Sequence, residues 1–287
     1  NFLKIFWIIT NISYAHSKNF KNISQIANAK AEIMNNIKKG GAVVLNIDDD
    51  FYSYHKNIAL KRKLKVISFG INNKSSTIKL IKIKKNNIRY EIFINIEGST
   101  VSFYSYNDNK SNLYNMLATL ASIYLYIDIK DLKKDIFLNF KTPSGRGDVS
   151  KIRLNDKYFY LVDETYNSNP LSLKTAIENY DKIELKNSKK YLIMGDMLEL
   201  GKHSVKQHKL ISYIINKSKI DKVYVIGKYI KETFNGLKLN KKAEILNNKT
   251  GIIDLISKNL DNNDYLMIKG SNSTGLHKIT THLKQRI

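Results

Sequence analysis

The sequence contains no cysteine, only two prolines and very little arginine. Without cysteine, the protein has no disulfide, no thiolate-bound zinc or iron–sulfur cluster, and no thiol nucleophile. No apolar run approaches the roughly 20 residues that cross a bilayer, and the longest, 5–12, is interrupted by Thr10 and Asn11. No charged and apolar leader opens the chain either, so we expect a cytoplasmic protein without a membrane span.

The formal net charge of +23 comes almost entirely from lysine, since only five of the 48 basic residues are arginine. Lysine, asparagine and isoleucine share A/T-rich codons, so drift in base composition explains the charge better than a nucleic-acid surface does. Arginine is the residue best suited to bidentate contacts with phosphate and guanine. We therefore expect no specific nucleic-acid binding, and we expect Arg146, retained between two glycines, to do what lysine cannot.

The length of 287 residues suggests two domains. The first half is predicted to alternate buried strands with helices and then to form an antiparallel meander followed by two helices. These elements are expected at 4–12, 22–37, 41–46, 52–63, 64–69, 77–106, 112–128 and 130–139. Gly40 and Gly41 close the first of these helices.

The segment KTPSGRGD (141–148) contains a proline and two glycines, so we place the domain boundary there. The predicted domains are 1–141 and 142–287. A hairpin is predicted first, and then strands alternate with helices. These elements are expected at 151–154, 158–163, from 169 onward, 191–195, 204–217, 222–227, 248–260 and 265–270, with a last helix at the end. The alternation predicts an α/β fold with mostly parallel sheets in both domains.

Polar clusters follow four of the predicted strands, at 11–16, 48–50, 195–201 and 269–274. Ligands of open parallel sheets bind at the carboxyl ends of the strands. One such cluster is more often an ordinary loop, but four together favour a polyanionic ligand in a cleft between two domains. Asp163 also ends a strand, where a carboxylate commonly binds a ribose hydroxyl.

Lys30 shares the apolar face of the 22–37 helix with Ile26 and Met34. The pattern alone favours a lysine that extends its amine to the edge of the core. The alternative is a partly desolvated amine that reacts with CO2, so that its carbamate becomes a metal ligand. His16 also has two interpretations. A lone histidine is more often structural, and as part of a magnesium site it would need carboxylate oxygens beside it.

Several strings resemble the Mur ligases, a family of ATP-dependent amide ligases. Four of them are TNISYAHSKNFKNISQIANAKAEI (10–33), LNIDDD (45–50), SNLYNMLA (111–118) and GRGD (145–148). Two long strings resemble strings found in the family members that add D-alanyl-D-alanine. They are DETYNSNPLSLKTAI (163–177) and GDMLELGKHSVKQH (195–208). KGSNSTGLHKIT (269–280) is similar to a further family string, although Asn272 stands where the family usually has arginine. In SNLYNMLA, Ser111 stands where the family usually has histidine.

The resemblance implies that ATP activates the carboxylate of UDP-N-acetylmuramoyl-tripeptide and that the amine of D-alanyl-D-alanine attacks the acyl phosphate. His16 and a carbamylated Lys30 would be catalytic and hold Mg²⁺. The nucleotide would bind to Asn112, Asn115, Arg146 and Asp163. The residues expected to bind substrate are Asn167, Asn169, Asp196, Glu199, Lys269 and Ser271. We expect a cytoplasmic monomer; the third residue of the tripeptide stays open.

The glycine-rich phosphate loop of the family, GTxGKT, does not occur in residues 1–287. Its backbone and lysine would hold the β- and γ-phosphates. The resemblance therefore implies an incomplete central ATPase domain, followed by a Rossmann-like C-terminal domain, in a chain that we expect to be truncated at its amino end. We expect an unpaired sheet edge beside 4–12. The alternatives are a non-catalytic remnant and a Mur-type ligase of another specificity.

Overall fold

The computed structural model describes residues 6–73, 75–140 and 142–285. The described residues form two compact units. The first unit runs to Ile12 and resumes from Phe20 to the end of the domain predicted as 1–141. The second unit begins again at Thr142 and also contains Ser13–Asn19, a segment that the sequence analysis assigns to the first domain.

The first unit contains one six-stranded sheet and three helices. In chain order these are β1 (Phe6–Ile9), α1 (Ile23–Ala31), β2 (Ala42–Asn46), α2 (Tyr52–Lys61), β3 (Lys65–Gly70), β4 (Ile78–Asn86), β5 (Arg89–Ile96), β6 (Ser99–Ser105) and α3 (Lys110–Ile123). The strands are paired in their order along the chain. The pairs from β1 to β4 are parallel, and β4, β5 and β6 form the predicted antiparallel meander.

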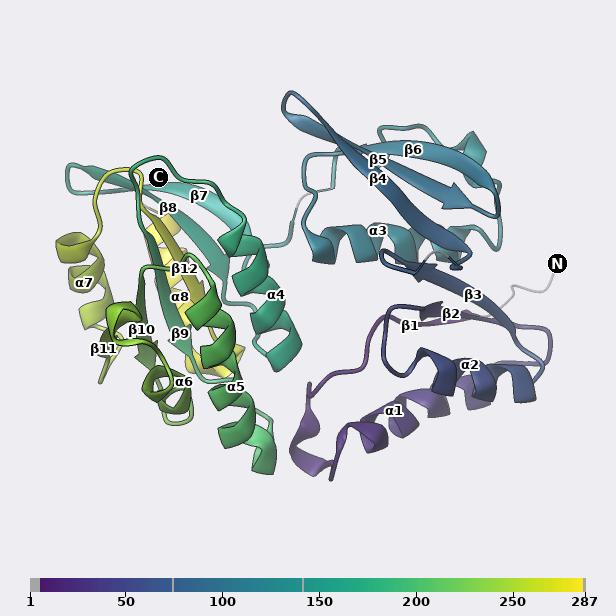
Figure 1. Ribbon diagram of the computed structural model, residues 1–287, viewed down its shortest axis with the longest axis horizontal. Coiled ribbons are helices and arrows are strands. Elements are labelled where there is room, and N and C mark those ends of the chain that lie inside the picture. Colours follow the sequence, from purple (N-terminus) through teal and green to yellow (C-terminus); the bar gives the residue numbers. More distant parts are fainter. Residues whose placement is uncertain (1–5, 74, 141, 286–287) are drawn as a thin grey trace. The chain divides into compact units, whose positions relative to one another are not determined.

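The helices of the first unit cover both faces of its sheet (Figure 1). α1 and α2 lie on one side of β1–β3, and α3 lies on the other side, beneath the curled meander. The core between α3 and the strands consists of fully buried aliphatic and aromatic side chains, among them Ile67, Phe69, Phe103 and Leu117. This packing places the carboxyl ends of β1 and β2 at one edge, where the predicted Lys30 site lies.

The second unit also has a six-stranded sheet. Its elements are β7 (Asp148–Leu154), β8 (Lys157–Glu164), α4 (Pro170–Asp181), β9 (Lys190–Gly195), α5 (Ser204–Lys217), β10 (Lys222–Ile226), α6 (Lys231–Asn235), β11 (Lys242–Ile245), α7 (Gly251–Asn259), β12 (Tyr265–Lys269) and α8 (Leu276–Lys284). The strand order is β11-β10-β9-β12-β8-β7, and only β7 is antiparallel to its neighbour.

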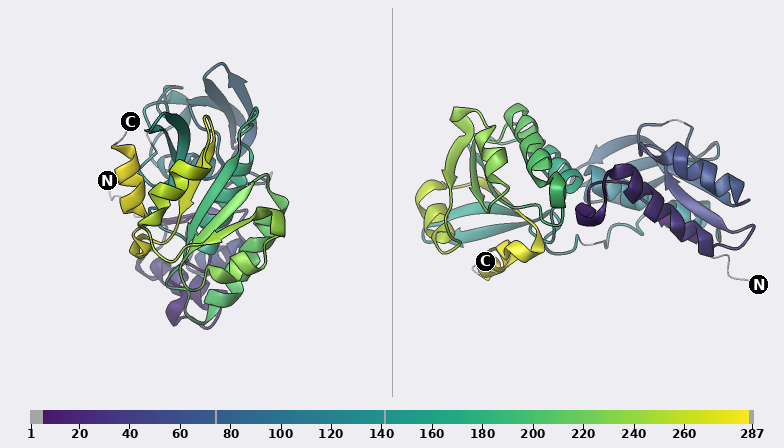
Figure 2. Two further views of the ribbon diagram at one scale, coloured as in Figure 1. Left: turned by 90° about the vertical axis from the view of Figure 1, so that its left-hand side faces the viewer. Right: turned by 90° about the horizontal axis from the view of Figure 1, so that it is seen from below.

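Helices again cover both faces of this sheet. Side chains of α7 and α8 form one hydrophobic core with the strands, and those of α4 and α5 form another. The right-hand view in Figure 2 shows α8, in yellow, across the sheet from the green helices. The predicted α/β fold class with largely parallel sheets is therefore confirmed.

Local sequence explains how several elements begin. Asn169 caps α4, since its side chain accepts the N–H of Ser172 while the Ser172 hydroxyl accepts the N–H of Asn169. Pro170 follows at the first helical position, where its missing N–H costs nothing. The β7–β8 hairpin turns at Asn155, whose positive φ of 54° suits asparagine better than most residues.

The predicted helix over 130–139 is wrong. Beyond α3 the structure has a single 3-10 turn, Ile129–Asp131, and then irregular backbone. The carbonyl of Lys134 accepts the N–H of Tyr104 on β6, and Phe137 packs edge-on against Phe103. Because these contacts hold the segment against the meander, tertiary packing overrides its helical pattern.

Other boundaries also differ from the prediction. The strand predicted as buried at 4–12 is β1 within the described residues, and its Trp7 and Ile8 are 38% exposed because β1 lies at the sheet edge. The predicted helix 22–37 changes to 3-10 geometry over Glu32–Asn36. Neither α6 nor β11 was predicted, because their segments are too short to show a periodic pattern.

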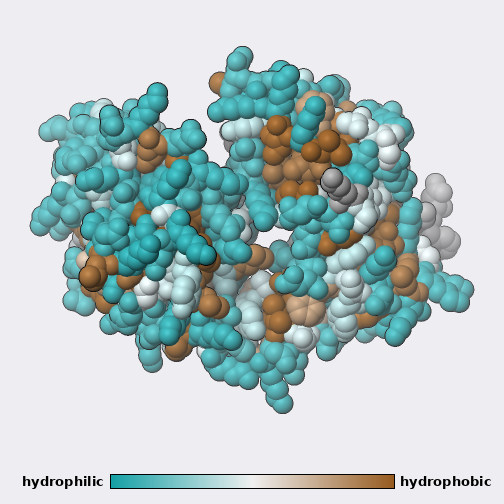
Figure 3. All heavy atoms as spheres, in the orientation of Figure 1, coloured by the Kyte–Doolittle hydropathy of each residue, from teal (hydrophilic) through white to brown (hydrophobic). Residues whose placement is uncertain are grey.

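No helix in the described ranges is long and apolar enough to cross a membrane. Figure 3 shows a mostly hydrophilic surface over the second unit, as the lysine content predicts. Hydrophobic colour gathers over the meander of the first unit, where Ile81 and Ile88 are exposed.

Candidate functional site

Three loops meet at the carboxyl edge of the second sheet, after β8, β9 and β12. Ser271, one of the predicted substrate residues, connects all three. Its N–H donates to the Asp196 carbonyl at 3.0 Å, and its hydroxyl donates to the Ser168 carbonyl at 3.2 Å. The Leu198 N–H donates to the same hydroxyl at 2.8 Å. Ser271 is 5% exposed, so its place in the structure is that of a buried link between loops.

Lys269 is the second buried link. Its amine lies 3.3 Å from a Glu164 carboxylate oxygen and 3.0 Å from the Asn167 carbonyl, and its side chain is 2% exposed. Burial lowers the pKa of Lys269, an effect that the Glu164 carboxylate opposes. Burial also raises the pKa of Glu164, against the influence of Lys269. The ion pair therefore holds two partly desolvated charges beneath Asn167, whose own side chain is exposed.

Asp163 is buried behind this pair. Its carboxylate accepts hydrogen bonds from the Lys284 amine at 2.6 Å and from the hydroxyl and N–H of Thr165. Burial alone would raise the pKa of Asp163, but these hydrogen bonds outweigh it and lower the pKa. Lys284 also pairs with Asp148. The side chain predicted to bind ribose is thus 2% exposed and already occupied.

Arg146, by contrast, is exposed and held from one side only. Its guanidinium lies over the Tyr166 ring, 4.0 Å from the centroid. Gly145 has a φ of +78°, and a side chain there would meet the Tyr166 backbone nitrogen at 2.8 Å. Glycine is therefore required for this approach. Arg146 is exposed, and a guanidinium stacked on one face keeps its edge donors for an anionic ligand.

The two carboxylates after β9 have different surroundings. Both oxygens of Asp196 accept backbone N–H groups, from Lys228, Tyr229 and Ile230, at 2.7–2.9 Å. Asp196 is 7% exposed and therefore anchors the loop after β10. Glu199 points outward, and its side chain is 59% exposed.

His16 contacts Glu199. The Nδ1 atom of His16 lies within hydrogen-bonding distance of a Glu199 carboxylate oxygen, and both residues have positive φ angles. The surrounding segment Ser13–Asn19 packs against the 199–203 turn, where Tyr14 lies 4.9 Å from the His203 ring between centroids. The Lys18 backbone also occupies the space that a side chain at Gly201 would need. His16 is thus placed in the second unit beside the predicted substrate loop.

Lys30 lies in the first unit. Its position in α1 follows the buried Ile26 and Ala27 by four and three residues, as the pattern predicts, although much of the residue is exposed. Its amine donates to the Asn11 carbonyl in the loop after β1, at 3.0 Å, so the charged end is less exposed than the rest of the side chain. Burial of the amine lowers the pKa of Lys30, against the influence of Asp49. A lowered pKa favours the neutral amine that carbamate formation requires.

Asn112 and Asn115 lie on α3 of the first unit. The Asn112 amide donates to the Ser105 hydroxyl and the Asn107 carbonyl, so it fixes the turn before the helix. Asn115, three residues later, is exposed. Asn169 is occupied in a similar way as the cap of α4.

No group of three histidine, aspartate or glutamate side chains in the described residues is arranged to hold a metal ion. Mg²⁺ prefers carboxylate and phosphate oxygens in an octahedral arrangement.

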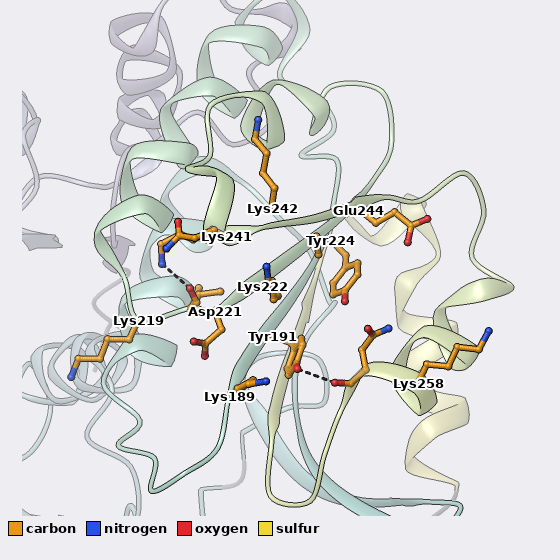
Figure 4. Close-up of a pocket in the computed structure, with 14 residues that line it drawn as sticks. Lys189, Tyr191, Lys219, Asp221, Lys222, Tyr224, Lys241, Lys242, Glu244 and Lys258 are labelled. Carbon is orange, nitrogen blue, oxygen red and sulfur yellow. Dashed lines mark hydrogen bonds between the residues drawn. The ribbon is translucent and has the colours of Figure 1, made fainter.

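A cavity of about 810 Å³ lies at the opposite edge of the second sheet. Figure 4 shows its lining, which includes Lys222, Lys241, Asp221 and Tyr224. None of the predicted site residues lines it. The Lys241 amine is not available to a ligand, because it donates to the Ser218 and Ile220 carbonyls.

Sequence reasoning missed three contributors to the carboxyl edge as site residues. Tyr166 supports Arg146, Glu164 pairs with Lys269, and Lys284 neutralises Asp163. The Asp163-Glu164 pair after a strand was a usable signal for Glu164. Lys284 carried no signal, because it is one lysine among many and lies 121 residues from its partner.

The chain matches two family descriptions that are consecutive along its length. Residues 6–123 match the Mur ligase middle domain, and residues 150–272 match the Mur ligase, glutamate ligase domain. The chain therefore belongs to the Mur ligase family.

Among its relatives, the UDP-N-acetylmuramoyl-tripeptide–D-alanyl-D-alanine ligases are prominent. The protein of that name from Buchnera aphidicola subsp. Baizongia pistaciae is 30% identical over 285 residues, covering 96% of this chain and 58% of the relative. The one from Rickettsia prowazekii is 29% identical, covering 96% and 60%. The chain thus spans about three fifths of the length of these relatives.

Solved structures agree in fold. MurF from Acinetobacter baumannii superposes with a TM-score of 0.79 at 20% identity, covering 98% of this chain and 59% of that one. MurF ligase from Thermotoga maritima, in complex with ADP, has a TM-score of 0.77 at 22% identity, covering 98% and 62%.

Proposed function

We propose that the chain is part of an ATP-dependent ligase that joins D-alanyl-D-alanine to UDP-N-acetylmuramoyl-tripeptide in peptidoglycan precursor synthesis. ATP phosphorylates the tripeptide carboxylate, the dipeptide amine attacks the acyl phosphate, and ADP and phosphate leave. One observation carries the proposal. The segments 163–177, 195–208 and 269–280, which resemble this branch of the family, meet in a hydrogen-bonded cluster at one sheet edge. We also propose a cytoplasmic, monomeric protein.

The exposed groups of this edge are the candidates for direct contact. Arg146 is the candidate for phosphate binding, and the support of its guanidinium on the Tyr166 ring favours it. Glu164 is a better candidate than the buried Asp163 for a ribose hydroxyl, because its side chain is 18% exposed. Asn167 and Glu199 remain candidates for the dipeptide, with Glu199 suited to its ammonium group.

We propose that ATP is used together with Mg²⁺. His16 and a carbamylated Lys30 would be the protein contacts of the Mg²⁺ ion. The lowered pKa of Lys30, caused chiefly by burial, supports the carbamate. The described residues hold no ready-made cluster of ligands, so phosphate oxygens of the substrates would complete the coordination.

A second candidate function is nucleotide and dipeptide binding without turnover. The observation in its favour is that residues 1–287 contain no GxxxxGK[ST] string. That loop neutralises the transferred phosphate, and its contribution to the rate is large. Binding and turnover therefore need separate tests.

Binding is tested by titrating ADP into the full chain and into two matched variants. Arg146→Lys removes the planar fork that binds phosphate in two places, so we expect about tenfold weaker binding, from one lost charge-assisted contact of about 1.5 kcal/mol. Arg153→Lys is the control, because Arg153 also lies over a tyrosine, Tyr158, but on β7, with 5.7 Å to its ring centroid. Equal affinities for the two variants would contradict the nucleotide site.

Turnover is tested as ADP release that requires both UDP-N-acetylmuramoyl-tripeptide and D-alanyl-D-alanine, with Mg²⁺ and bicarbonate present. We expect no measurable rate from residues 1–287. Joining the unmatched segment of the Buchnera relative to the amino end should restore it, and Lys30→Ala in that hybrid should abolish most activity. Robust turnover by the chain alone would contradict the need for a phosphate loop. A hybrid indifferent to Lys30→Ala would exclude the carbamate.

A further inference from the structure

His208 lies on α5, directly beneath the 196–201 loop, and is completely buried. Both nitrogens of its ring are used. The Nδ1 atom lies 2.7 Å from the Ser204 carbonyl oxygen, and the Nε2 atom lies 2.9 Å from the Met197 backbone nitrogen. The His208 ring is thus the side-chain acceptor of the Met197 N–H.

The two contacts fix the protonation state of the ring. A carbonyl oxygen only accepts, so Nδ1 must carry a proton. A backbone N–H only donates, so Nε2 must be unprotonated. Burial lowers the pKa of His208, although the Ser204 carbonyl, Asp196 after β9 and Glu232 on α6 act in the opposite direction. The Tyr229 ring packs 5.9 Å from the imidazole between centroids. The surroundings thus favour the neutral ring that the hydrogen bonds require.

The hydrogen bond to His208 controls the shape of the loop. The Met197 N–H is tied to His208, and the next N–H, of Leu198, is tied to Ser271. Two successive backbone groups are therefore fixed immediately before Glu199, which has a left-handed φ of 63°. Met197 and Leu200 are fully buried on either side. This arrangement turns the Glu199 carboxylate outward.

We propose that His208 is a positioning residue: as the neutral Nδ1–H imidazole, it holds the Met197 backbone so that Glu199 is presented to the amine substrate. Protonation of Nε2 would place two donors against each other and release the loop. The substrate part of this inference rests on the proposed function, whereas the tautomer and the loop contact do not.

The tautomer is tested by nitrogen NMR of the full chain labelled on histidine. At pH 7 we expect the buried ring to show a protonated Nδ1 and an unprotonated Nε2. The opposite tautomer, or a doubly protonated ring, would overturn the proposal. This measurement uses the unaltered protein and so does not depend on whether a variant folds.

The loop contact is tested by hydrogen exchange at the Met197 and Leu198 amides. His208→Leu removes the acceptor, and we expect at least tenfold faster exchange there. His208→Gln keeps one donor and one acceptor and should restore most of the protection. His55→Leu is the control, because His55 is also buried and bonded to a backbone carbonyl, of Ala27, but in the first unit. Similar exchange in His208→Leu and the wild-type chain would refute the contact.

The substrate part is tested by titrating D-alanyl-D-alanine. We expect at least fivefold weaker binding by His208→Leu, recovery to within about twofold by His208→Gln, and no change in His55→Leu. A loosened loop with unchanged affinity would overturn the positioning role and leave the proposed function intact. No binding by the wild-type chain would contradict the proposed substrate, and the tautomer and exchange results alone would then decide the loop contact.

Discussion

Lysine amines at the two edges of the second sheet have different principal partners. At the carboxyl edge, Lys269 and Lys284 form ion pairs with Glu164 and Asp163. At the amino edge, lysine amines donate to backbone carbonyls at the ends of helices, where the helix dipole places partial negative charge. Lysine therefore neutralises carboxylates at the carboxyl edge, whereas at the amino edge it mainly caps helices, with Lys157 also paired to Asp261.

The capping at the amino edge is systematic. Four consecutive helices, α4 to α7, each end on a carbonyl that accepts a lysine amine. The donor and acceptor pairs are Lys190 to Asp181, Lys241 to Ser218, Lys242 to Asn235 and Lys157 to Leu260. Two of these donors, Lys241 and Lys242, also line the cavity in Figure 4, so their amines are engaged by the protein itself.

The largest effect should follow from breaking the carboxyl edge with Lys269→Met. Glu164 would lose its partner while still largely buried, and removing one partner of a buried pair costs about 3–5 kcal/mol. Urea unfolding should show this loss in the free energy of unfolding. Lys174→Met is the control, because its ion pair with Glu178 is exposed, and it should change the value by less than about 0.5 kcal/mol. A stable Lys269→Met chain would mean that the pair is not structural.

Lys284→Met should have an intermediate effect, a loss of about 2 kcal/mol in the free energy of unfolding at pH 7, because Asp163 stays buried with Thr165 as its remaining side-chain donor.

The same ion pair should make stability depend on pH. The folded-state pKa of Asp163 is lowered, so its contribution to stability is present above the unfolded pKa of 3.8 and is lost as pH falls through the folded pKa. Hydrogen bonds to Asp148 and Asp163 outweigh burial and raise the pKa of Lys284, so its contribution is lost above pH 10.5.

The free energy of unfolding, measured across pH, should therefore fall less steeply at both extremes of pH in Lys284→Met than in the wild-type chain. Parallel pH profiles for the two proteins would show that the Asp163 interaction contributes nothing. Lys278→Met on the same helix is a matched control, since it removes one lysine charge from α8 and leaves the ion pairs of Lys284 intact.

The smallest effect should come from the amino edge. Lys241→Met removes the cap of two carbonyls, and two neutral partners left buried should cost about 1–2 kcal/mol in the free energy of unfolding. Lys258→Met, in the same cavity but exposed, should stay within about 0.5 kcal/mol of the wild type. An effect of Lys241→Met as large as that of Lys269→Met would erase the distinction between the two edges.

Periodicity and turn chemistry predicted most of the fold, because those elements are specified locally. The Asn169-Pro170 start of α4 and the meander of the first unit are examples, and both are confirmed. The helix predicted at 130–139 failed because the contact between Lys134 and Tyr104 is not local. Short elements such as α6 offer too few residues for a periodic signal.

Motif strings predicted the three loops that meet at the carboxyl edge of the second sheet, but not which of their side chains are free. Asp196 and Glu199 look alike in sequence, and yet only Glu199 is exposed, because the loop after β10 takes both oxygens of Asp196. The roles predicted for the individual site residues stay predictions until the experiments above are done. What the structure adds is the distinction between side chains that can meet a ligand and those that hold the loops.

The position of Ser13–Asn19 in the second unit bears on the order in which the protein is made. The contact between His16 and Glu199 joins residues 183 positions apart. On the ribosome, this segment must wait until residues 199–203 have been synthesised before it can find its place. The Ser13–Asn19 segment is therefore made well before the rest of the unit that it joins, and that unit reaches its final form only after residues 199–203 have emerged.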